Sequence, residues 1–508
     1  MGIVLHKVCL RLKNQARNIP ILLWEREGRS VSMPPQMDSP IDTKIQPSGP
    51  DPDGIVERES GLHRNLSERQ VAMIGLGCTI GTGLFIGSAI SVQVAGPGVI
   101  LSFLSGAAIA LTVMWALAEM AAEHPAAGSF GLYGEMYIHP WAGFAIRYTY
   151  WLCLVVIIGS EVVAAAICCK LWFPAVSPMV WIAIFSAVLL YVNTLSIENF
   201  GSLEFWFSMI KVITIAAFLL LGTALVLGIG FPRIGFANYT QGGGFLPHGW
   251  SGVGLGITMA IFSFLGLEIV GSTAGEAANP RTAVPKALRR TLFYLVLFYV
   301  GSLALVVALV PWNRISLNES LFVRVFQTVG IRSAEHFMNF VVLTAALSSA
   351  MCNLYFTSRM LFSLSRGGYA PGALGRLNKR GMPVNAVLLS GVGMLAALFI
   401  SSKFKDTAFA IMIGVAFFGG PFVWIMTLLT HLRFRRAMKL QGRDYLRFAP
   451  RGPWSSLLGI AALVGVLIST WWIPEFHTTL RSGGPWLLFI TLCYLVWRQV
   501  GKPHTAAE

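Results

Sequence analysis

Long apolar segments recur along this chain from residue 71 onwards, with polar loops between them. An α-helix needs about 20 consecutive apolar residues to cross the roughly 30 Å hydrocarbon core of a bilayer. The segments have about that length, so they predict an all-α polytopic membrane protein with twelve transmembrane helices. We place the predicted spans at residues 71–95, 98–121, 143–170, 178–197, 203–229, 251–278, 287–310, 336–364, 384–402, 407–431, 454–473 and 484–499.

Composition agrees with that class and narrows the partners. Hydrophobic residues make up 55% of the chain and charged residues only 12%, whereas soluble globular proteins carry about 25% charged residues. The net charge of +15 would also suit nucleic-acid binding, but the excess Lys and Arg lies in loops, as the positive-inside rule requires. We therefore expect a lipid bilayer as partner and no nucleic acid. The more basic set of loops predicts a multi-pass protein of the cytoplasmic (inner) membrane with both termini cytoplasmic.

The two ends of the chain differ from the spans. Residues 1–60 mix basic residues with Pro, Ser and Asp and have no periodic apolar pattern, which predicts a disordered cytoplasmic N-terminal tail. No apolar run there reaches the roughly 7–15 residues of a signal-peptide core. We expect residues 61–500 to form the transmembrane domain and residues 501–508 a short cytoplasmic C-terminal tail. Translation from Met33 or Met37 is an alternative to the printed start.

The first predicted span is interrupted in its middle, where residues 79–83 read Thr-Ile-Gly-Thr-Gly. Each glycine in a helix costs about 1 kcal/mol relative to alanine. A break inside the bilayer leaves backbone groups that only protein or a ligand can cover, and secondary transporters build midplane substrate sites from such breaks. The alternative is that glycines only allow close helix packing, which we prefer for Gly75 and Gly87.

A second interruption occurs five spans later, where residues 262–268 read Phe-Ser-Phe-Leu-Gly-Leu-Glu. Segments five spans apart enter the membrane from opposite sides. Paired breaks in two halves of opposite orientation suggest inverted-topology repeats. We therefore predict a five-plus-five inverted repeat with broken helices 1 and 6, followed by two extra C-terminal helices.

The chemistry of paired breaks favours a zwitterion. The N-terminus of a half-helix presents free N–H groups and a partial positive charge, which attract a carboxylate. The C-terminus of a half-helix and the unwound carbonyls present partial negative charge, which attracts an ammonium group. Gly81 and Gly83 let the backbone approach the carboxylate closely, and Thr82 can add a hydroxyl donor. The pattern thus indicates an amino acid as ligand.

Motifs along the chain resemble those of a known family. In order they are residues 62–66 (LHRNL), 80–87 (IGTGLFIG), 95–98 (AGPG), 119–121 (EMA), 125–130 (PAAGSF), 205–212 (FWFSMIKV), 275–280 (GEAANP) and 358–364 (SRMLFSL). The chain resembles, from about Leu62 to the last span, the amino acid transporter family of the amino acid–polyamine–organocation superfamily, which contains bacterial and fungal amino acid permeases. The resemblance implies the five-plus-five fold with two extra helices, and amino acid uptake that is usually coupled to protons.

The resemblance also implies a set of substrate contacts. The substrate carboxylate would meet the N–H groups of residues 81–83, and its ammonium would meet the carbonyls of Thr79, Phe262 and Leu265. Phe262 would cover the bound substrate as a gate. Together with Glu161 from the third span, the expected substrate-binding residues are Thr79, Ile80, Gly81, Thr82, Gly83, Phe262, Leu265, Gly266 and Glu161.

Charges inside spans are expensive and are functional candidates by default. Lys211 lies in the fifth span, and the resemblance implies that a lysine here replaces the sodium ion of sodium-coupled members. We therefore predict proton coupling through Lys211, with a permanently charged residue bonded to first-span carbonyls as the alternative. Glu268, beside the second break, either orients the unwound segment or carries a proton. Glu161 faces the side-chain end of the pocket or is a protonated acid bonded within the bundle.

Three more charges lie near span ends, and the chain departs from the family pattern at two places. We interpret Glu119, Glu276 and Arg359 as gate or packing ion pairs near cytoplasmic span ends. Residues 351–352 (Met-Cys) stand where many relatives have Asn-Ser, and Arg147 stands where Gly-Trp-Asn is common. These departures leave the substrate side chain undecided, although the aromatic-rich spans favour a neutral or apolar one.

Rival functions find less support. No HExxH, GxSxG or P-loop pattern suggests an enzyme, and no filter-like ring suggests a channel. The seven cysteines form no CxxC pair, so we expect no disulfide framework, metal or cofactor. We predict a secondary active transporter that imports an amino acid by proton symport through alternating access. An exchanger is the nearest alternative, and a sensor of amino acids without transport is another.

Overall fold

The structure of the chain is a computed structural model that describes residues 68–125, 129–195, 197–272, 280–315, 320–330, 332–404 and 407–500. Every regular element within these ranges is a helix. The predicted tails, residues 1–60 and 501–508, lie outside the described residues, and so does Glu276. The expectations for these parts stay predictions.

The elements carry α for α-helices and η for 3₁₀ helices, except η2, which is a π-helix. They are α3 (Glu68–Thr79), η2 (Gly83–Gly87), α4 (Ser88–Ala95), η3 (Gly96–Gly98), α5 (Val99–Glu123), α6 (Ser129–Tyr137), α7 (Pro140–Lys170), α8 (Pro178–Asn193), α9 (Ile197–Leu227), η4 (Ala237–Tyr239), α10 (Gly249–Phe264), α11 (Ile269–Ser272), α12 (Pro280–Leu309), η6 (Trp312–Arg314), α13 (Leu321–Val329), α14 (Arg332–Arg366), η7 (Gly372–Gly375), α15 (Val384–Ser390), α16 (Val392–Lys403), α17 (Ala408–Phe417), α18 (Gly419–Leu440), α19 (Trp454–Ser469), η8 (Thr470–Trp472), η9 (Pro474–Phe476) and α20 (Thr478–Val500).

Ten helical stretches in the described part of the chain are long and apolar enough to cross a membrane. One of them, Gly75–Glu123, contains the first two predicted spans, which separate at Gly96, where φ is 58°. The predicted span 178–197 corresponds to α8, which has only 16 residues. The all-α polytopic architecture is therefore confirmed, while the exact number of crossings stays a prediction.

Some helices continue beyond the predicted spans. α18 runs to Leu440, past the predicted end at residue 431, and α9 begins at Ile197 rather than at residue 203. The added residues are partly polar, so a prediction from hydropathy alone leaves them out of the spans. Long side chains such as Arg, Lys and Met have high helix propensity, so the helix continues where the apolar run has ended.

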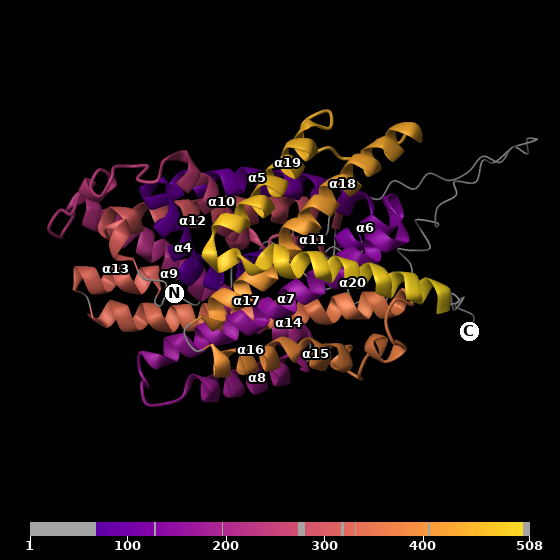
Figure 1. Ribbon diagram of the computed structural model, residues 1–508, viewed down its shortest axis with the longest axis horizontal. Helices are drawn as coiled ribbons and strands as arrows, with labels where there is room; N and C mark the ends of the chain where they lie inside the picture. Colours follow the sequence, from indigo (N-terminus) through magenta and orange to yellow (C-terminus); the bar gives the residue numbers. More distant parts are fainter. Residues whose placement is uncertain are drawn as a thin grey trace, which may run out of the picture. The chain divides into compact units, whose positions relative to one another are not determined.

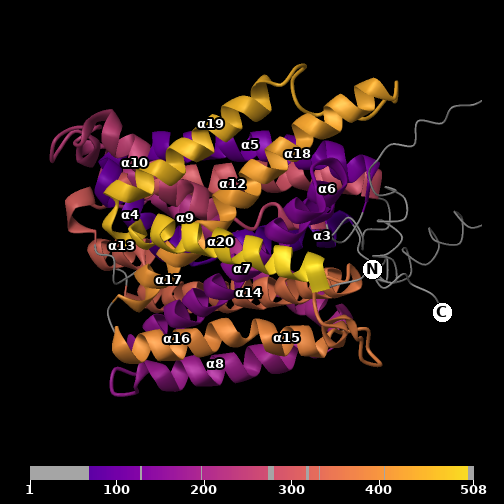
Figure 2. The same cartoon turned by 45° about the vertical axis from the view of Figure 1, so that its right-hand side comes forward.

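The helices are arranged around one central pair. α7 lies beside α14, with α8, α15 and α16 together on one side (Figures 1 and 2). α5, α10 and α12 pack together on the other side, and α20 crosses α7 and α17 at the periphery. The short helix α3 packs against α9, α12 and α14. The first predicted break is thereby surrounded by protein.

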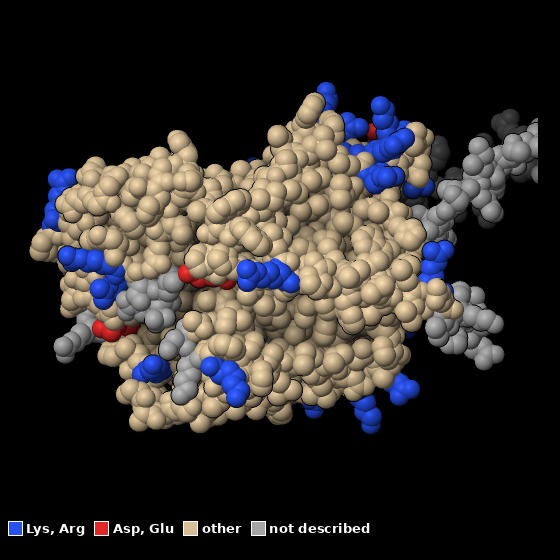
Figure 3. Space-filling model, in the orientation of Figure 1, with Lys and Arg blue, Asp and Glu red and all other residues tan. Residues whose placement is uncertain are grey.

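The outer surface suits lipid. Large apolar side chains are exposed on several helices; Leu220, for example, is 75% exposed and Phe399 is 66% exposed. Uncharged residues cover most of the face in Figure 3, where Lys and Arg outnumber Asp and Glu. Exposed apolar surface of this extent is expected where hydrocarbon, not water, contacts the protein.

Both predicted breaks are present. α3 ends at Thr79 and regular hydrogen bonding resumes in η2 at Gly83. α10 ends at Phe264, Leu265 is extended with ψ 142°, and Gly266 has φ of 100°. This conformation favours glycine because it has no Cβ. A Cβ at Gly266 would also come within 3.2 Å of the Cys78 carbonyl oxygen, so the two breaks face each other closely.

Candidate functional site

A cavity lies between the two breaks. It contains about 340 Å³ of space that atoms do not fill, open solvent included. Its walls come from α3, η2, α7, α10, α14 and the two unwound segments. The lining residues are Cys78, Thr79, Gly81, Gly83, Leu154, Ile157, Glu161, Phe262, Ser263, Leu265, Gly266, Ser349 and Asn353.

Most of the predicted substrate-binding residues thus share one cavity, but Ile80 and Thr82 are not in its lining. Leu154, Ile157 and Asn353 are lining residues that were not predicted from the sequence; they reach the cavity from α7 and α14. These three lie in uninterrupted helices without a local motif. Only the packing of α7 and α14 against the breaks brings them to the ligand space.

Glu161 lies at the amide end of the first break. Its two carboxylate oxygens accept long hydrogen bonds from the Thr82 N–H, at 3.3 and 3.4 Å, and one of them accepts from the Ser349 hydroxyl at 2.9 Å. The Thr82 hydroxyl is close to the same carboxylate without a hydrogen bond of normal geometry. Glu161 is thus bonded within the bundle, as one of the two sequence hypotheses expected, and it also lines the cavity. Its contact with a substrate side chain stays a prediction.

The carbonyl end of the first break is held by two side chains from neighbouring helices. The Tyr299 hydroxyl donates to the Thr79 carbonyl at 2.9 Å. The Lys211 ammonium donates to the Gly77 carbonyl at 2.6 Å and to the Ile80 carbonyl at 3.0 Å. The Thr79 carbonyl also accepts from the Gly81 N–H at 3.0 Å, so both of its lone pairs are engaged in this structure. Ile80 turns its carbonyl to Lys211, which explains its absence from the cavity wall.

Lys211 is fully buried on α9 and lies outside the cavity wall. Its bonds to the Gly77 and Ile80 carbonyls are the contacts that the structural alternative for this lysine expected. A buried cation can occupy the place of a metal ion there, because carbonyl oxygens are the ligands of both.

Glu268 holds the second break together. It accepts from the Gly266 N–H at 3.2 Å with each carboxylate oxygen and from the Tyr150 hydroxyl of α7. The Trp424 indole of α18 lies close to the carboxylate without a hydrogen bond of normal geometry. Glu268 therefore covers a backbone N–H that the helix break leaves without a partner, as the orienting hypothesis requires.

Glu204 is a buried charge near the site that the sequence analysis did not identify. Both of its carboxylate oxygens lie 2.8 Å from the Ser348 hydroxyl of α14, and one lies 2.9 Å from the Ser208 hydroxyl. Its side chain is fully buried. The sequence signal that could have identified Glu204 is the one that identified Lys211, a charge within a predicted span. Glu204 was missed because it lies close to the start of that span.

The remaining singled-out charges have partners away from the cavity. Glu119 accepts from His431 at 2.7 Å and from Arg435 at 2.7 Å, which is the packing ion pair expected of it. Arg147 pairs with Glu135 in the interior. The Arg359 guanidinium lies over the Tyr355 ring at 3.6 Å. The Arg147 substitution in the family pattern is thus balanced by a buried carboxylate outside the cavity wall.

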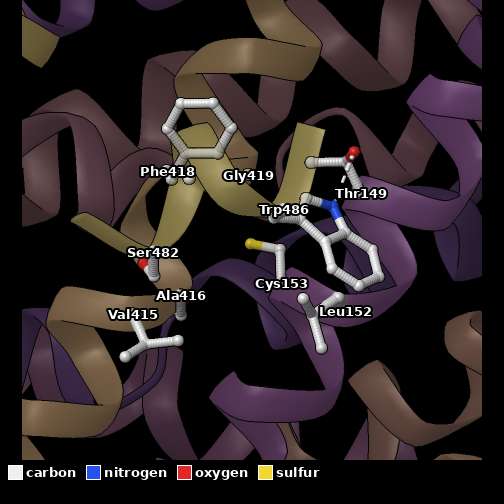
Figure 4. A pocket seen from close by; sticks show the side chains of 10 residues that line it. Thr149, Leu152, Cys153, Val415, Ala416, Phe418, Gly419, Ser482 and Trp486 are labelled. Carbon is white, nitrogen blue, oxygen red and sulfur yellow. Dashed lines mark hydrogen bonds between the residues drawn. The ribbon is translucent and has the colours of Figure 1, made fainter. Parts of the chain in front are cut away.

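A second hollow lies between α7, the junction of α17 and α18, and α20 (Figure 4). The Trp486 indole donates to the Thr149 hydroxyl at 3.0 Å beside it. Its walls are mainly apolar and include none of the predicted site residues. It offers no charge to a zwitterion, so the cavity between the breaks remains the candidate site.

Known proteins with similar sequences indicate the family in which this arrangement occurs. The sequence model of the family described as "Amino acid permease" matches residues 70–505. The chain is 37% identical over 445 residues to the aromatic amino acid transport protein AroP of Escherichia coli K12, covering 87% of this chain and 97% of that protein. It is 37% identical over 454 residues to the gamma-aminobutyric acid permease of Bacillus subtilis, covering 89% and 97%. It is 36% identical over 442 residues to the uncharacterized amino acid permease YtnA of Bacillus subtilis, covering 86% and 96%.

Proposed function

Because the chain belongs to the amino acid permease family, we propose that it imports an amino acid across the cell membrane by proton symport through alternating access. Members of this family are transporters and not enzymes. The chain is a multi-pass membrane protein. The observation that carries the proposal is the cavity between two helix breaks, which lies between the start of η2 and the ends of α3 and α10.

Substrate recognition follows from this polarity. The amides of Gly81, Thr82 and Gly83 begin the half-helix that continues through η2, a place that favours a carboxylate. The Thr82 N–H now donates to Glu161 and the Gly81 N–H to the Thr79 carbonyl, so a substrate carboxylate would replace these acceptors. The carbonyls of Thr79, at the end of α3, and Leu265, just beyond the end of α10, would attract an ammonium. At Thr79 the ammonium would replace Tyr299 or the Gly81 N–H as donor. Peptide groups supply these contacts, so any α-amino acid could satisfy them. Selectivity among amino acids would come from the cavity walls around the side chain.

Those walls favour a neutral, apolar side chain. Leu154, Ile157, Phe262 and Leu265 are the large apolar residues of the lining, and the centre of the Phe262 ring lies 6.4 Å from that of the Phe417 ring. The names of similar proteins indicate aromatic amino acids in one case and gamma-aminobutyric acid in another. Neither substrate carries a net charge at neutral pH. We propose a neutral amino acid, with Phe262 as the gate over it.

We propose that the helices form a five-plus-five inverted repeat with two extra helices, and that both termini are cytoplasmic. Support comes from two breaks five predicted spans apart that face each other. Basic loops on one side of the predicted spans support the orientation. Alternating access would then move one group of helices against the other around a fixed site.

Coupling is assigned to Lys211. In the protonated state its ammonium joins the carbonyls of Gly77 and Ile80, which holds the first break in its present shape. Loss of the proton removes a donor and leaves those carbonyls without a cation, so the break would be free to change shape. A buried charge of this kind must be compensated or neutralised, and that requirement links proton release to conformational change.

Transport in proteoliposomes tests the proposal. Purified protein is reconstituted, and uptake of radiolabelled amino acids is measured with and without an inward proton gradient and with and without internal substrate. We expect accumulation of a neutral amino acid that requires the gradient. Uptake that requires internal substrate but no gradient would establish the exchanger instead. Binding without uptake would establish the sensor.

Lys211→Met separates coupling from a permanent structural charge. The change removes the titratable group and keeps an unbranched side chain of similar length. We expect loss of gradient-driven accumulation, with exchange of labelled for unlabelled substrate retained. Gradient-driven uptake at the normal rate in the variant would rule out the coupling role.

A further inference from the structure

Glu204 is a buried charge to which the proposed mechanism assigns no role. It lies on α9 with a fully buried side chain and is not part of the cavity wall, so it does not contact the substrate. A carboxylate in the interior of a membrane helix bundle is expensive and calls for a function or a compensating partner. The nearest candidate partner on its own helix is Lys211.

The side chains of Glu204 and Lys211 both lie against Gly77 of the first broken helix. The Gly77 carbonyl accepts from the Lys211 ammonium at 2.6 Å, and a methyl group added to Gly77 would overlap the Glu204 carboxylate. The two side chains are seven residues apart on α9, which is about two helical turns and places them on one face. One glycine therefore separates an ammonium group from a carboxylate.

Adjacent serines on α14 connect this pair to the cavity. Ser349 donates to Glu161 in the cavity wall, and Ser348 donates to Glu204. Along the first broken helix, Glu161 bonds at Thr82, and Lys211 bonds at Ile80 and Gly77. Glu204 lies at Gly77 and is linked through the Ser208 hydroxyl to the Met73 carbonyl. The three titratable groups thus form a series that leads away from the cavity.

We propose that Glu204 is a second proton site of the transporter, which receives the proton that leaves Lys211. This inference rests on the proton coupling proposed above. In the transfer the Lys211 ammonium becomes an amine and the Glu204 carboxylate becomes a carboxylic acid, so the proton is conserved and the interior keeps its net charge. Deprotonation of Lys211 to water would instead leave Glu204 as an uncompensated buried charge, which is strongly unfavourable. From Glu204 the proton leaves on the side remote from the substrate.

The surroundings of Glu204 leave Lys211 as its partner for proton exchange. The other titratable groups that face it are the thiols of Cys78 on α3 and Cys352 on α14. A thiol has an ordinary pKa near 8.5, so both thiols stay protonated around neutral pH and below. Tyr299 of α12 is bonded to the Thr79 carbonyl instead.

Glu204→Gln tests the proposal because glutamine keeps the shape and both serine contacts but cannot take up a proton. Reconstituted protein is measured in two modes, net uptake driven by a proton gradient and exchange at equal pH on both sides. We expect net uptake to fall at least tenfold, equivalent to about 1.4 kcal/mol, while exchange continues near the rate of the unaltered protein. Glu335→Gln, at a carboxylate bonded to Gln327 at the start of α14, is the control and should change neither mode.

Glu204→Asp is the conservative variant. It retains a carboxylic acid at a shifted position, so net uptake should persist with a displaced pH profile. If Glu204→Gln does not reach the membrane, this displacement is the deciding measurement. Normal net uptake and an unchanged pH profile in both variants would overturn the proposal, and so would an equal loss of both modes at normal membrane levels.

The unaltered protein distinguishes this failure from a failure of the proposed function. If it accumulates amino acid in response to the gradient, the variants judge Glu204 alone. If it transports without any response to the gradient, proton coupling is refuted and Glu204 loses its role with it. If it transports no amino acid in either mode, the proposed function itself is refuted.

Discussion

Replacing Gly83 with valine tests whether the first break must remain open to a ligand. A Cβ at Gly83 would lie 3.2 Å from the Ser263 Cα, closer than the roughly 3.5–4.0 Å that carbon atoms prefer, and would touch the Phe262 Cδ1 at 3.5 Å. Alanine would therefore need a shift of a few tenths of an ångström, and overpacking of this kind costs about 1–3 kcal/mol. If the same free energy is lost from substrate binding, the affinity for substrate falls roughly 5- to 150-fold.

Valine adds two more carbons where the first is already too close, and they extend over the amides that would hold the substrate carboxylate. We expect Gly83→Ala to raise the KM for uptake within the range above and Gly83→Val to abolish uptake. Radiolabelled uptake should be measured together with the amount of protein at the cell surface, because the prediction is loss of transport at normal expression.

Gly254 provides the matched control on α10. A Cβ added there meets no atom within 4 Å, so Gly254→Ala and Gly254→Val should leave uptake nearly unchanged. Near-normal uptake by Gly83→Val at normal surface levels would refute the assignment of the backbone at residues 81–83 to the substrate. Equal losses at Gly83 and Gly254 would show that glycine replacement harms the bundle generally.

Three further changes have defined outcomes. Gly266→Ala forces a side chain into φ of 100°, which costs about 1–3 kcal/mol, so thermal stability in detergent and uptake should both fall. Glu135→Leu leaves the buried Arg147 without its carboxylate, a loss of about 3–5 kcal/mol, and membrane expression should drop; normal melting behaviour would contradict this. Thr79→Val should leave uptake largely intact, since the Thr79 hydroxyl donates to Gly75 of its own helix at 2.7 Å, and a complete loss would show that the side chain, not the carbonyl, contacts substrate.

The sequence was most informative where one local signal had one physical cause. Apolar runs of bilayer length predicted the helices, because hydrocarbon admits no unsatisfied backbone. Glycines inside such runs predicted the two breaks, and Gly266 has the positive φ that only glycine adopts easily. The helix ends were less predictable, as at Leu440, because hydropathy does not report where helix propensity stops.

The functional side chains were predictable as candidates but not as contacts. Lys211 and Glu268 were visible as charges inside apolar segments, and the structure supplies their bonds to the two breaks. Glu161 was visible in the same way, yet its bond to the Thr82 N–H depends on how α7 packs against η2. Glu204 lay too close to a span end to be noticed, although burial makes it equivalent to the others.

By itself, the amino-acid sequence determined that the chain crosses a membrane as helices, that two of them are interrupted, and which family it belongs to. These properties depend on residues close together in the chain. The tertiary structure alone decided that the interruptions face each other across one cavity, and that Glu161, Lys211 and Glu204 follow one another along the first of them. Residues 79 or more positions apart become neighbours only when helices pack, and no local pattern encodes that approach.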